Sequence, residues 1–243
     1  MSGFMPPTAF VMIKVSQPKA FSTRTGNATW RIDHLSHGPG SVAFNLNGPQ
    51  GSVPVVVPKP GLHVARNAAG ALALLGELGI DLLGAAEGLR GFSGVRRRFE
   101  VRGRIGGVVV VDDYAHHPTE VAATIQAAKL GHSGRVVAVF QPHRFTRTRD
   151  HGAALGEALT GADLAFVTDV YAAGEAPIPG ITGRSVVDAA ARAGADVTYV
   201  PRRADLAVTV ADATGPGDLI LLLGAGDITL VADEITPLLA ERQ

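Results

Sequence analysis

One short segment gathers side chains that could transfer protons. Residues 112–120 read DDYAHHPTE, which places two carboxylates, a tyrosine and two histidines in direct succession around one alanine. Carboxylate and imidazole groups are the usual general acids and bases of enzymes. His117 on its own is more typical of a helix cap, because a proline suited to the first helical position follows it. The grouping of these side chains before one helix favours a functional site instead.

A second segment carries positive charge where a helix is expected to begin. Residues 141–150 read QPHRFTRTRD and place Arg144, Arg147 and Arg149 around that helix start. Cations are unfavourable at the positive end of a helix dipole unless an anion or an acidic neighbour offsets them. Arginine forks bind carboxylates and phosphates through paired hydrogen bonds. The alternative, which we favour only for Arg149, is internal pairing with nearby acids: Asp112, Asp113 or Asp150.

The pattern of the chain after Gly91 predicts the elements that position these segments. Runs of Val, Ile and Leu alternate with amphipathic stretches, which is typical of a parallel sheet covered by helices on both faces. Strands are expected at 107–112, 135–140, 163–168, 197–200 and 218–223, and helices at 118–130, 148–159, 184–193, 204–213 and 228–239. Because ligands of such Rossmann-like α/β sheets bind beyond the carboxyl ends of the strands, both segments are expected in one site.

Residues 1–91 have a different pattern. Short β-prone runs at 10–15, 28–35, 41–46 and 53–57 are separated by Gly, Pro and Asn, which favours a small antiparallel arrangement. Apolar residues then recur at helical spacing over 62–78 and 81–91. A domain with only these few strands would be unusually small. We therefore interpret 1–91 as an incomplete domain and 92–243 as a complete one.

The composition excludes several classes of protein. The absence of cysteine excludes disulfides, thiolate metal sites and cysteine nucleophiles. With 22 basic and 22 acidic residues, no net charge recruits nucleic acid or a membrane surface, so small molecules are the expected partners. Neither a membrane helix nor a signal peptide is recognised, which predicts a cytoplasmic protein. Asp33, His34 and His37 mimic a metal-ligand spacing, but their strand context argues against a metal site.

Four segments in this order closely resemble the UDP-N-acetylmuramate:L-alanine ligases of the Mur ligase family. They are RRFE at 97–100, DDYAHHPTE at 112–120, QPHRFTRTRD at 141–150 and DVYAAGEAP at 169–177. A looser likeness covers 61–69, where His63 and Asn67 match the family pattern and Val64 departs from it. The resemblance implies that 92–243 is the carboxyl-terminal Rossmann-like domain and that 1–91 is part of the central ATPase domain.

The resemblance also implies a reaction and roles for single residues. Such ligases phosphorylate the carboxylate of UDP-N-acetylmuramate with ATP and Mg²⁺, and the amine of L-alanine then attacks the acyl phosphate. Carried over by matching position, the nucleotide contacts are Asn67, Arg98 and Asp113, the last of them near the ribose or adenine. The group around the amino acid and the reacting carboxylate is Tyr114, His116, Arg144 and Arg147, of which the last three would be catalytic.

The 243 residues contain no Gly-x-x-x-x-Gly-Lys-Ser/Thr phosphate loop. We therefore expect no ligase activity from the chain alone, and a separate chain could carry the missing amino-terminal domains. Two alternatives remain open. One is a non-catalytic binding or regulatory module derived from the ligase. The other is the related recycling ligase that adds a tripeptide, although the segment from Gln141 to Arg144 argues against it.

Overall fold

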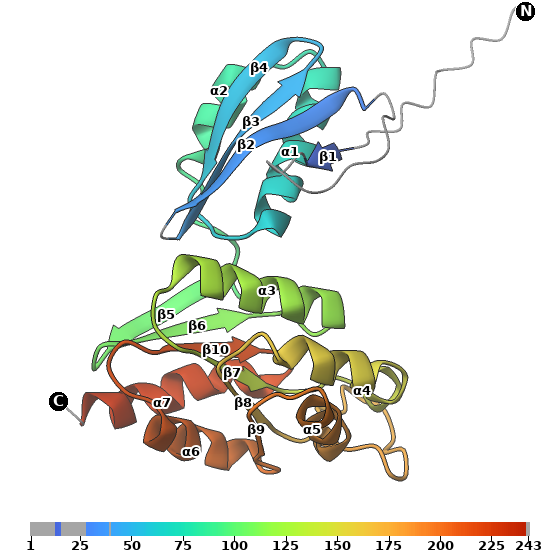
Figure 1. Cartoon of the computed structure of the whole chain (residues 1–243), viewed down its shortest axis with the longest axis vertical. Coiled ribbons are helices and arrows are strands. Elements are labelled where there is room, and N and C mark those ends of the chain that lie inside the picture. Colours follow the sequence, from blue (N-terminus) through green and yellow to red (C-terminus); the bar gives the residue numbers. More distant parts are fainter. Residues whose placement is uncertain (1–12, 16–27, 39, 242–243) are drawn as a thin grey trace, which may run out of the picture. The chain divides into compact units, whose positions relative to one another are not determined.

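A computed structural model of the chain describes residues 13–15, 28–38 and 40–241. The chain divides into two compact units, Met1–Ser93 and Gly94–Gln243, which are coloured blue to green and green to red in Figure 1. The expected fold class is confirmed, since the second unit is an α/β domain built on a mainly parallel sheet. None of the helices in the described part of the chain has the length and apolar character needed to cross a membrane.

The first unit is a four-stranded sheet with two helices packed on one face. Alternation along its third strand buries Val42, Phe44 and Leu46 and so gives the sheet one apolar face. That face forms a single core with the helices, which contribute Leu72 and Leu82 among others. The elements are β1 (Ile13–Val15), β2 (Trp30–Gly38), β3 (Ser41–Gly48), β4 (Gly51–Val57), α1 (Leu62–Glu77) and α2 (Leu82–Leu89).

The expected antiparallel arrangement is correct for three of these strands and wrong for the first. β2 pairs antiparallel with β3, and β3 with β4, whereas β1 lies parallel to β2. Parallel neighbours need a connection of about a dozen residues or more. Residues 16–29 provide that length, although their Pro and Gly content suggests an ordinary turn. Residues 10–12, also expected in this strand, lie outside the described residues.

Trp30 anchors the core of the first unit and leaves no room for a side chain at Gly76. The indole is 1% exposed and donates a hydrogen bond of 2.8 Å to Glu77. A Cβ at Gly76 would lie 2.5 Å from the indole ring. We expect Gly76→Ala to lower the free energy of unfolding by about 1–3 kcal/mol through overpacking, although alanine is the better helix former by about 1 kcal/mol.

Gly88→Ala is the matched control, because a Cβ at this position in α2 meets nothing within 4 Å. This variant should gain about 0.5–1 kcal/mol from helix propensity alone. Urea unfolding followed by the fluorescence of Trp30, the single tryptophan, would measure both variants. Stabilisation of the chain by Gly76→Ala would contradict the packing described here.

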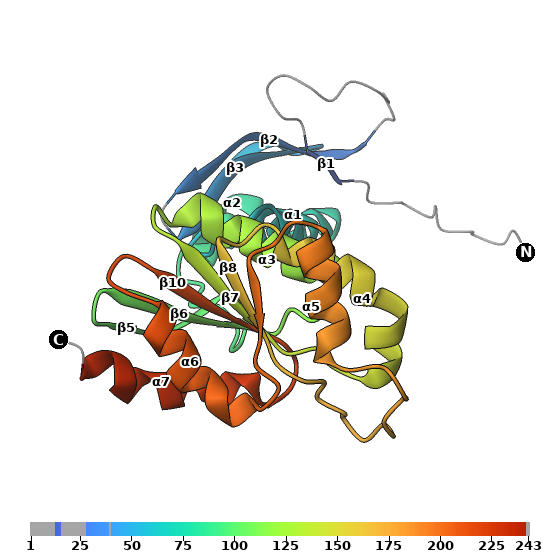
Figure 2. The ribbon, with the colours of Figure 1, turned by 60° about the horizontal axis from the view of Figure 1, so that its bottom comes forward.

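The second unit is a six-stranded sheet in the order β5-β6-β10-β7-β8-β9. One face is covered by α3, α4 and α5 and the other by α6 and α7, as Figure 2 shows. Strands β6, β7 and β10 are buried along their whole length, which explains their continuous apolar sequences. The elements are β5 (Glu100–Ile105), β6 (Val108–Asp113), α3 (Pro118–Gly131), β7 (Val136–Phe140), α4 (Phe145–Leu159), β8 (Leu164–Val167), α5 (Gly183–Arg192), β9 (Val197–Tyr199), α6 (Leu206–Ala213), β10 (Leu219–Leu223) and α7 (Val231–Ala240).

The edge strand β5 was not predicted, and it is antiparallel to β6. Val101 and Arg104 are exposed, and the pairing with β6 is irregular between Val101 and Gly103, so this edge strand lacks the regular apolar alternation that would have identified it. The other four strand pairs of this sheet are parallel, as predicted.

Several helices begin at other residues than expected. α4 starts at Phe145 rather than at residue 148, so Arg144 is its N-cap residue and Arg147 and Arg149 lie in its first turns. Turns of 3₁₀-helix at Arg203–Asp205 and Asp227–Leu230 precede α6 and α7. The arginines of 141–150 are therefore held by a rigid helix start and not by a loop.

Candidate functional site at the carboxyl end of the second sheet

Four rings form a row at the carboxyl end of the sheet, on the segments that follow three of its strands, β6, β7 and β8. Tyr114 and His116 follow β6, His143 follows β7 and Tyr171 follows β8. Successive ring centroids lie 5.2, 5.7 and 5.7 Å apart in the order Tyr114, His116, His143, Tyr171. A parallel β-bridge between His143 and Tyr171 fixes the end of the row. The two segments singled out in the sequence thus meet through His116 and His143.

His116 is oriented by the backbone in front of it. Its Nδ1 lies 2.8 Å from the carbonyl oxygen of Tyr114, which can only accept, so Nδ1 carries the proton and Nε2 of the neutral ring is an acceptor. Glu120 holds the same turn, since its carboxylate accepts the N–H groups of His116 and His117 at 3.2 Å each. Burial alone would raise the pKa of Glu120, but these backbone hydrogen bonds lower it. Because Nδ1 of His116 is bonded to Tyr114, Nε2 is the ring nitrogen that stays available to accept a proton.

His143 is kept neutral by its surroundings. Arg147 donates from Nη1 to the Nδ1 of His143 at 3.1 Å and to its carbonyl oxygen at 3.3 Å. Desolvation, followed by the positive charge of Arg147 and the nearby His116 and Arg144, lowers the pKa of His143 from 6.5 to about 4. A neutral His143 can accept from Arg147, so it fixes the guanidinium instead of repelling it.

We expect the His143 ring to stay unprotonated down to about pH 4, as read from its imidazole carbon shifts in an NMR titration. Because its folded pKa lies below the unfolded value of about 6.5, the unfolded chain takes up the proton first and stability falls as the pH drops from about 6.5 towards 4. Arg147→Met should raise the pKa of His143, whereas Arg149→Met should leave it in place. A His143 that titrates near 6.5 would contradict this arrangement.

Arg144 adopts a backbone conformation that is uncommon for any residue except glycine. Its φ is 71°, and it is held by its N–H, which donates to Tyr171 O at 2.8 Å, and by its carbonyl, which accepts from Thr148 N at 3.0 Å. The carboxylate of Glu175 accepts from the N–H and the hydroxyl of Thr146 at 3.0 and 2.7 Å, and these bonds lower its pKa. The positive φ of Arg144 is a strained backbone conformation. Strain of this kind persists only where the surroundings enforce it, and it is common at functional sites.

The arginines of this segment differ in their partners. Arg149 pairs with Asp150 at 2.8 Å, which confirms the internal pairing that we favoured for it. Arg144 is half exposed and lies 4.0 Å from Glu175, and Arg147 donates to His143 as described. The carboxylate of Asp112 is engaged elsewhere, by arginines at the start of this unit: Arg97 and Arg102.

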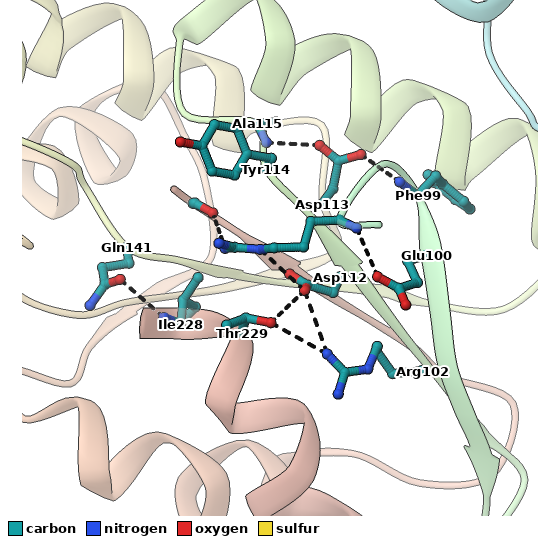
Figure 3. Close-up of polar contacts among 12 residues, drawn as sticks. Phe99, Glu100, Arg102, Asp112, Asp113, Tyr114, Ala115, Gln141, Ile228 and Thr229 are labelled. Carbon is teal, nitrogen blue, oxygen red and sulfur yellow. Dashed lines mark hydrogen bonds and ion pairs between the residues drawn. The ribbon is translucent and has the colours of Figure 1, made fainter. Parts of the chain in front are cut away.

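Tyr114 forms the other end of the row, and the guanidinium groups of two arginines lie over its ring. The guanidinium carbon of Arg97 lies 5.1 Å from the ring centroid and that of Arg98 lies 5.6 Å from it. Asp113, the residue before Tyr114, is 3% exposed and accepts the N–H groups of Phe99 and Ala115, each at 2.8 Å (Figure 3). Asp113 thus holds the turn that presents Tyr114, and its predicted nucleotide contact stays a prediction.

The structure brings together most of the residues predicted for the site. Those within the second unit are Arg98, Asp113, Tyr114, His116, Arg144 and Arg147, while Asn67 is exposed on α1 of the first unit. Their assigned roles stay predictions. Sequence reasoning gave no role to His143, Tyr171 or Arg97, although all three lie in the quoted segments. For His143 and Tyr171, their position just after β7 and β8 was the signal that could have found them, whereas Arg97 precedes β5, a strand that was not predicted.

In the ranges that the structure describes, no three His, Asp or Glu side chains are grouped to hold an ion. Asp33, one residue of the metal-like spacing, accepts a hydrogen bond of 2.8 Å from Asn47.

Comparisons with known proteins identify the family of the chain. The family described as "Mur ligase, glutamate ligase domain" matches residues 97–226. A UDP-N-acetylmuramate--L-alanine ligase of Anaeromyxobacter dehalogenans is 52% identical over 180 residues, which cover 74% of this chain and 39% of the relative. One from a Mycobacterium species (strain JLS) is 46% identical over 210 residues, or 84% of this chain and 43% of the relative. The chain thus spans about two fifths of the length of these relatives.

A solved structure gives the same result for the fold. The UDP-N-acetylmuramate-alanine ligase of Thermotoga maritima matches with a TM-score of 0.75 at 26% identity, over 88% of this chain and 46% of that one. The family match covers more than half of the chain and includes the whole row of rings. The resemblance read from the four segments is therefore confirmed, and the chain belongs to the Mur ligase family.

Proposed function

We propose that this chain supplies the carboxyl-terminal part of an ATP-dependent ligase that joins L-alanine to UDP-N-acetylmuramate in peptidoglycan synthesis. The observation that carries the proposal is the meeting of the β6 and β7 segments, with His116 and His143 5.7 Å apart and Arg147 bonded to His143. A proton acceptor and arginine side chains then lie together at the carboxyl end of the sheet. Joining an amine to an activated carboxylate requires both kinds of group.

The roles of the side chains follow from their geometry. Arg144 and Arg147 bind the carboxylate of the incoming amino acid, because their forks match it and Arg144 is half exposed. His116 accepts the proton that the amine loses as it attacks, through the Nε2 that its contact with Tyr114 leaves available. The same arginines offset the negative charge that develops on the acyl phosphate, and phosphate leaves as the amide forms.

The nucleotide and the metal fit this chain to different degrees. An exposed Arg98 beside the ring of Tyr114 offers positive charge and an aromatic face to the substrate ATP. Asn67 and Asp113 complete the proposed nucleotide contacts. For Mg²⁺, no three His, Asp or Glu side chains are grouped among the described residues.

The test is ADP release with UDP-N-acetylmuramate, L-alanine and magnesium ATP. The chain alone should give no turnover, because its 243 residues contain no phosphate loop and losing even one such preorganised electrostatic group lowers rates by about 10²–10³-fold. The amino-terminal part of the Anaeromyxobacter dehalogenans relative, up to the matched region, would then be added. The mixture should release ADP, and this release should depend on both UDP-N-acetylmuramate and L-alanine.

The alternatives predict other outcomes of the same assay. Turnover by the rigorously purified chain alone would refute the expectation of inactivity. Absence of ADP release in the mixture, together with binding of L-alanine to the chain, would favour a non-catalytic binding module. Release that depends on a tripeptide and not on L-alanine would favour the recycling ligase.

A further inference from the structure

We propose that Asp112 and Arg97 form a buried ion pair that positions Tyr114, so that both are positioning residues for the site. This inference rests on the proposed function in one respect only, namely that Tyr114 contacts substrate. The ion pair, the ring and their connection all lie within the second unit, and Figure 3 shows Asp112 and Tyr114 with their neighbours.

Asp112 is a fully buried carboxylate at the end of β6. It is 0% exposed, and its Oδ2 accepts a hydrogen bond of 2.6 Å from the hydroxyl of Thr229. The same oxygen lies 3.4 Å from Nε of Arg97 and 3.8 Å from Nη1 of Arg102. Burial makes an uncompensated charge costly, so Asp112 needs these cations and holds them in place.

Arg97 is itself held by two further hydrogen bonds. Its Nη2 donates to the carbonyl of Gly224 at 2.6 Å, and its N–H donates to Glu100 at 2.7 Å. Its φ is 56°, an uncommon value that these contacts enforce. Both the direction of the guanidinium and the backbone conformation of Arg97 are therefore fixed.

Tyr114 contacts Arg97 twice. The N–H of Tyr114 donates to the carbonyl of Arg97 at 2.7 Å, and the guanidinium of Arg97 lies 5.1 Å from the centroid of the ring. A cation at this distance is attracted to the face of the ring, which limits its rotation. Because the carbonyl of Tyr114 in turn orients His116, a shift of Tyr114 would reach the proposed proton acceptor.

Arg102 provides a matched comparison, because it also neutralises Asp112 but forms its other hydrogen bonds with different residues. Its Nη2 donates to Asp233 of α7 at 2.8 Å, and its Nη1 approaches Thr229 at 3.4 Å. Arg97→Met and Arg102→Met each remove one cation from the same carboxylate. A purely structural role for the ion pair predicts similar effects of both variants, whereas positioning predicts an effect on Tyr114 from Arg97→Met alone.

The experiment is ¹⁹F NMR of the 243-residue chain labelled with fluorotyrosine. The chain has three tyrosines, so three resonances are expected, and Tyr114→Phe assigns the one of interest. Arg97→Met and Asp112→Asn should shift and broaden the Tyr114 resonance, while those of Tyr171 and Tyr199 stay in place. Arg102→Met should leave all three unchanged, with circular dichroism showing that each variant is folded.

A Tyr114 resonance that is unchanged in Arg97→Met, or that moves equally in Arg102→Met, would overturn the inference. If Asp112→Asn does not fold, the pair of arginine variants still decides. The measurement needs no turnover, so its failure is separate from failure of the proposed function. In the mixture used for ADP release, Arg97→Met should raise KM more than it lowers kcat if Tyr114 contacts substrate in the ground state.

Discussion

Arg147→Met is expected to lower kcat/KM for L-alanine by about 10²–10³-fold in the mixture of this chain with the amino-terminal part of the Anaeromyxobacter dehalogenans relative. The methionine keeps much of the length of the side chain but removes the charge and the fork proposed to hold the carboxylate. It also removes the hydrogen bond to His143, which holds the guanidinium of Arg147 in place in the unsubstituted chain. Steady-state ADP release against L-alanine concentration measures the effect.

Arg149→Met is the matched control two residues along the same helix. Arg149 is about half exposed and already paired with Asp150, so its loss should change kcat/KM by about twofold or less, in keeping with the small worth of exposed ion pairs. Equal losses in both variants would show that only the overall charge of the α4 start matters. An unchanged Arg147→Met would remove Arg147 from the site.

Leu221→Ala is expected to lower the free energy of unfolding of the second unit by about 2–5 kcal/mol. Leu221 is 0% exposed on β10, which lies between β6 and β7 and contributes to the core beneath the helices. The substitution removes buried apolar contacts and leaves a cavity that the sheet cannot close. Urea unfolding followed by far-ultraviolet circular dichroism would measure the loss.

Two comparisons make the stability test specific. Leu230→Ala changes a leucine that is 47% exposed and should cost about 0.5 kcal/mol or less. The fluorescence of Trp30, which belongs to the first unit, should show an unchanged transition if the two units unfold independently. Similar losses for both leucine variants would contradict the central place of β10.

The sequence predicted the parallel strands of the second sheet because burial on both faces leaves a local signature. Val136 to Phe140 and Leu219 to Leu223 are apolar at every position, as only a fully covered strand can be. The ends of these strands then located Tyr114 and His116, since ligands of such sheets bind there. Two strands were not predicted correctly. The direction of β1 depends on how it pairs with β2, and β5, an edge strand of mixed charged and apolar residues, has no continuous apolar run that would mark it as a strand.

The finer geometry of the site was not readable from the sequence for a similar reason. The contacts of Arg97 join residues as distant in the sequence as Asp112 and Gly224. The left-handed conformation of Arg144 arises from its bond to Tyr171, on a different strand connection. Such pairings follow from tertiary packing and leave no local pattern.

The measurement that tests the central claim most directly is mass spectrometry of the product made by the mixture of the two parts. The mixture would receive UDP-N-acetylmuramate, magnesium ATP and equal amounts of ¹⁵N-labelled L-alanine and a cell-wall tripeptide. The proposed function predicts that labelled alanine is joined to the UDP-sugar, and that Arg147→Met abolishes most of this product. Formation of the tripeptide product instead, or ADP release without any amide, would contradict the proposed function.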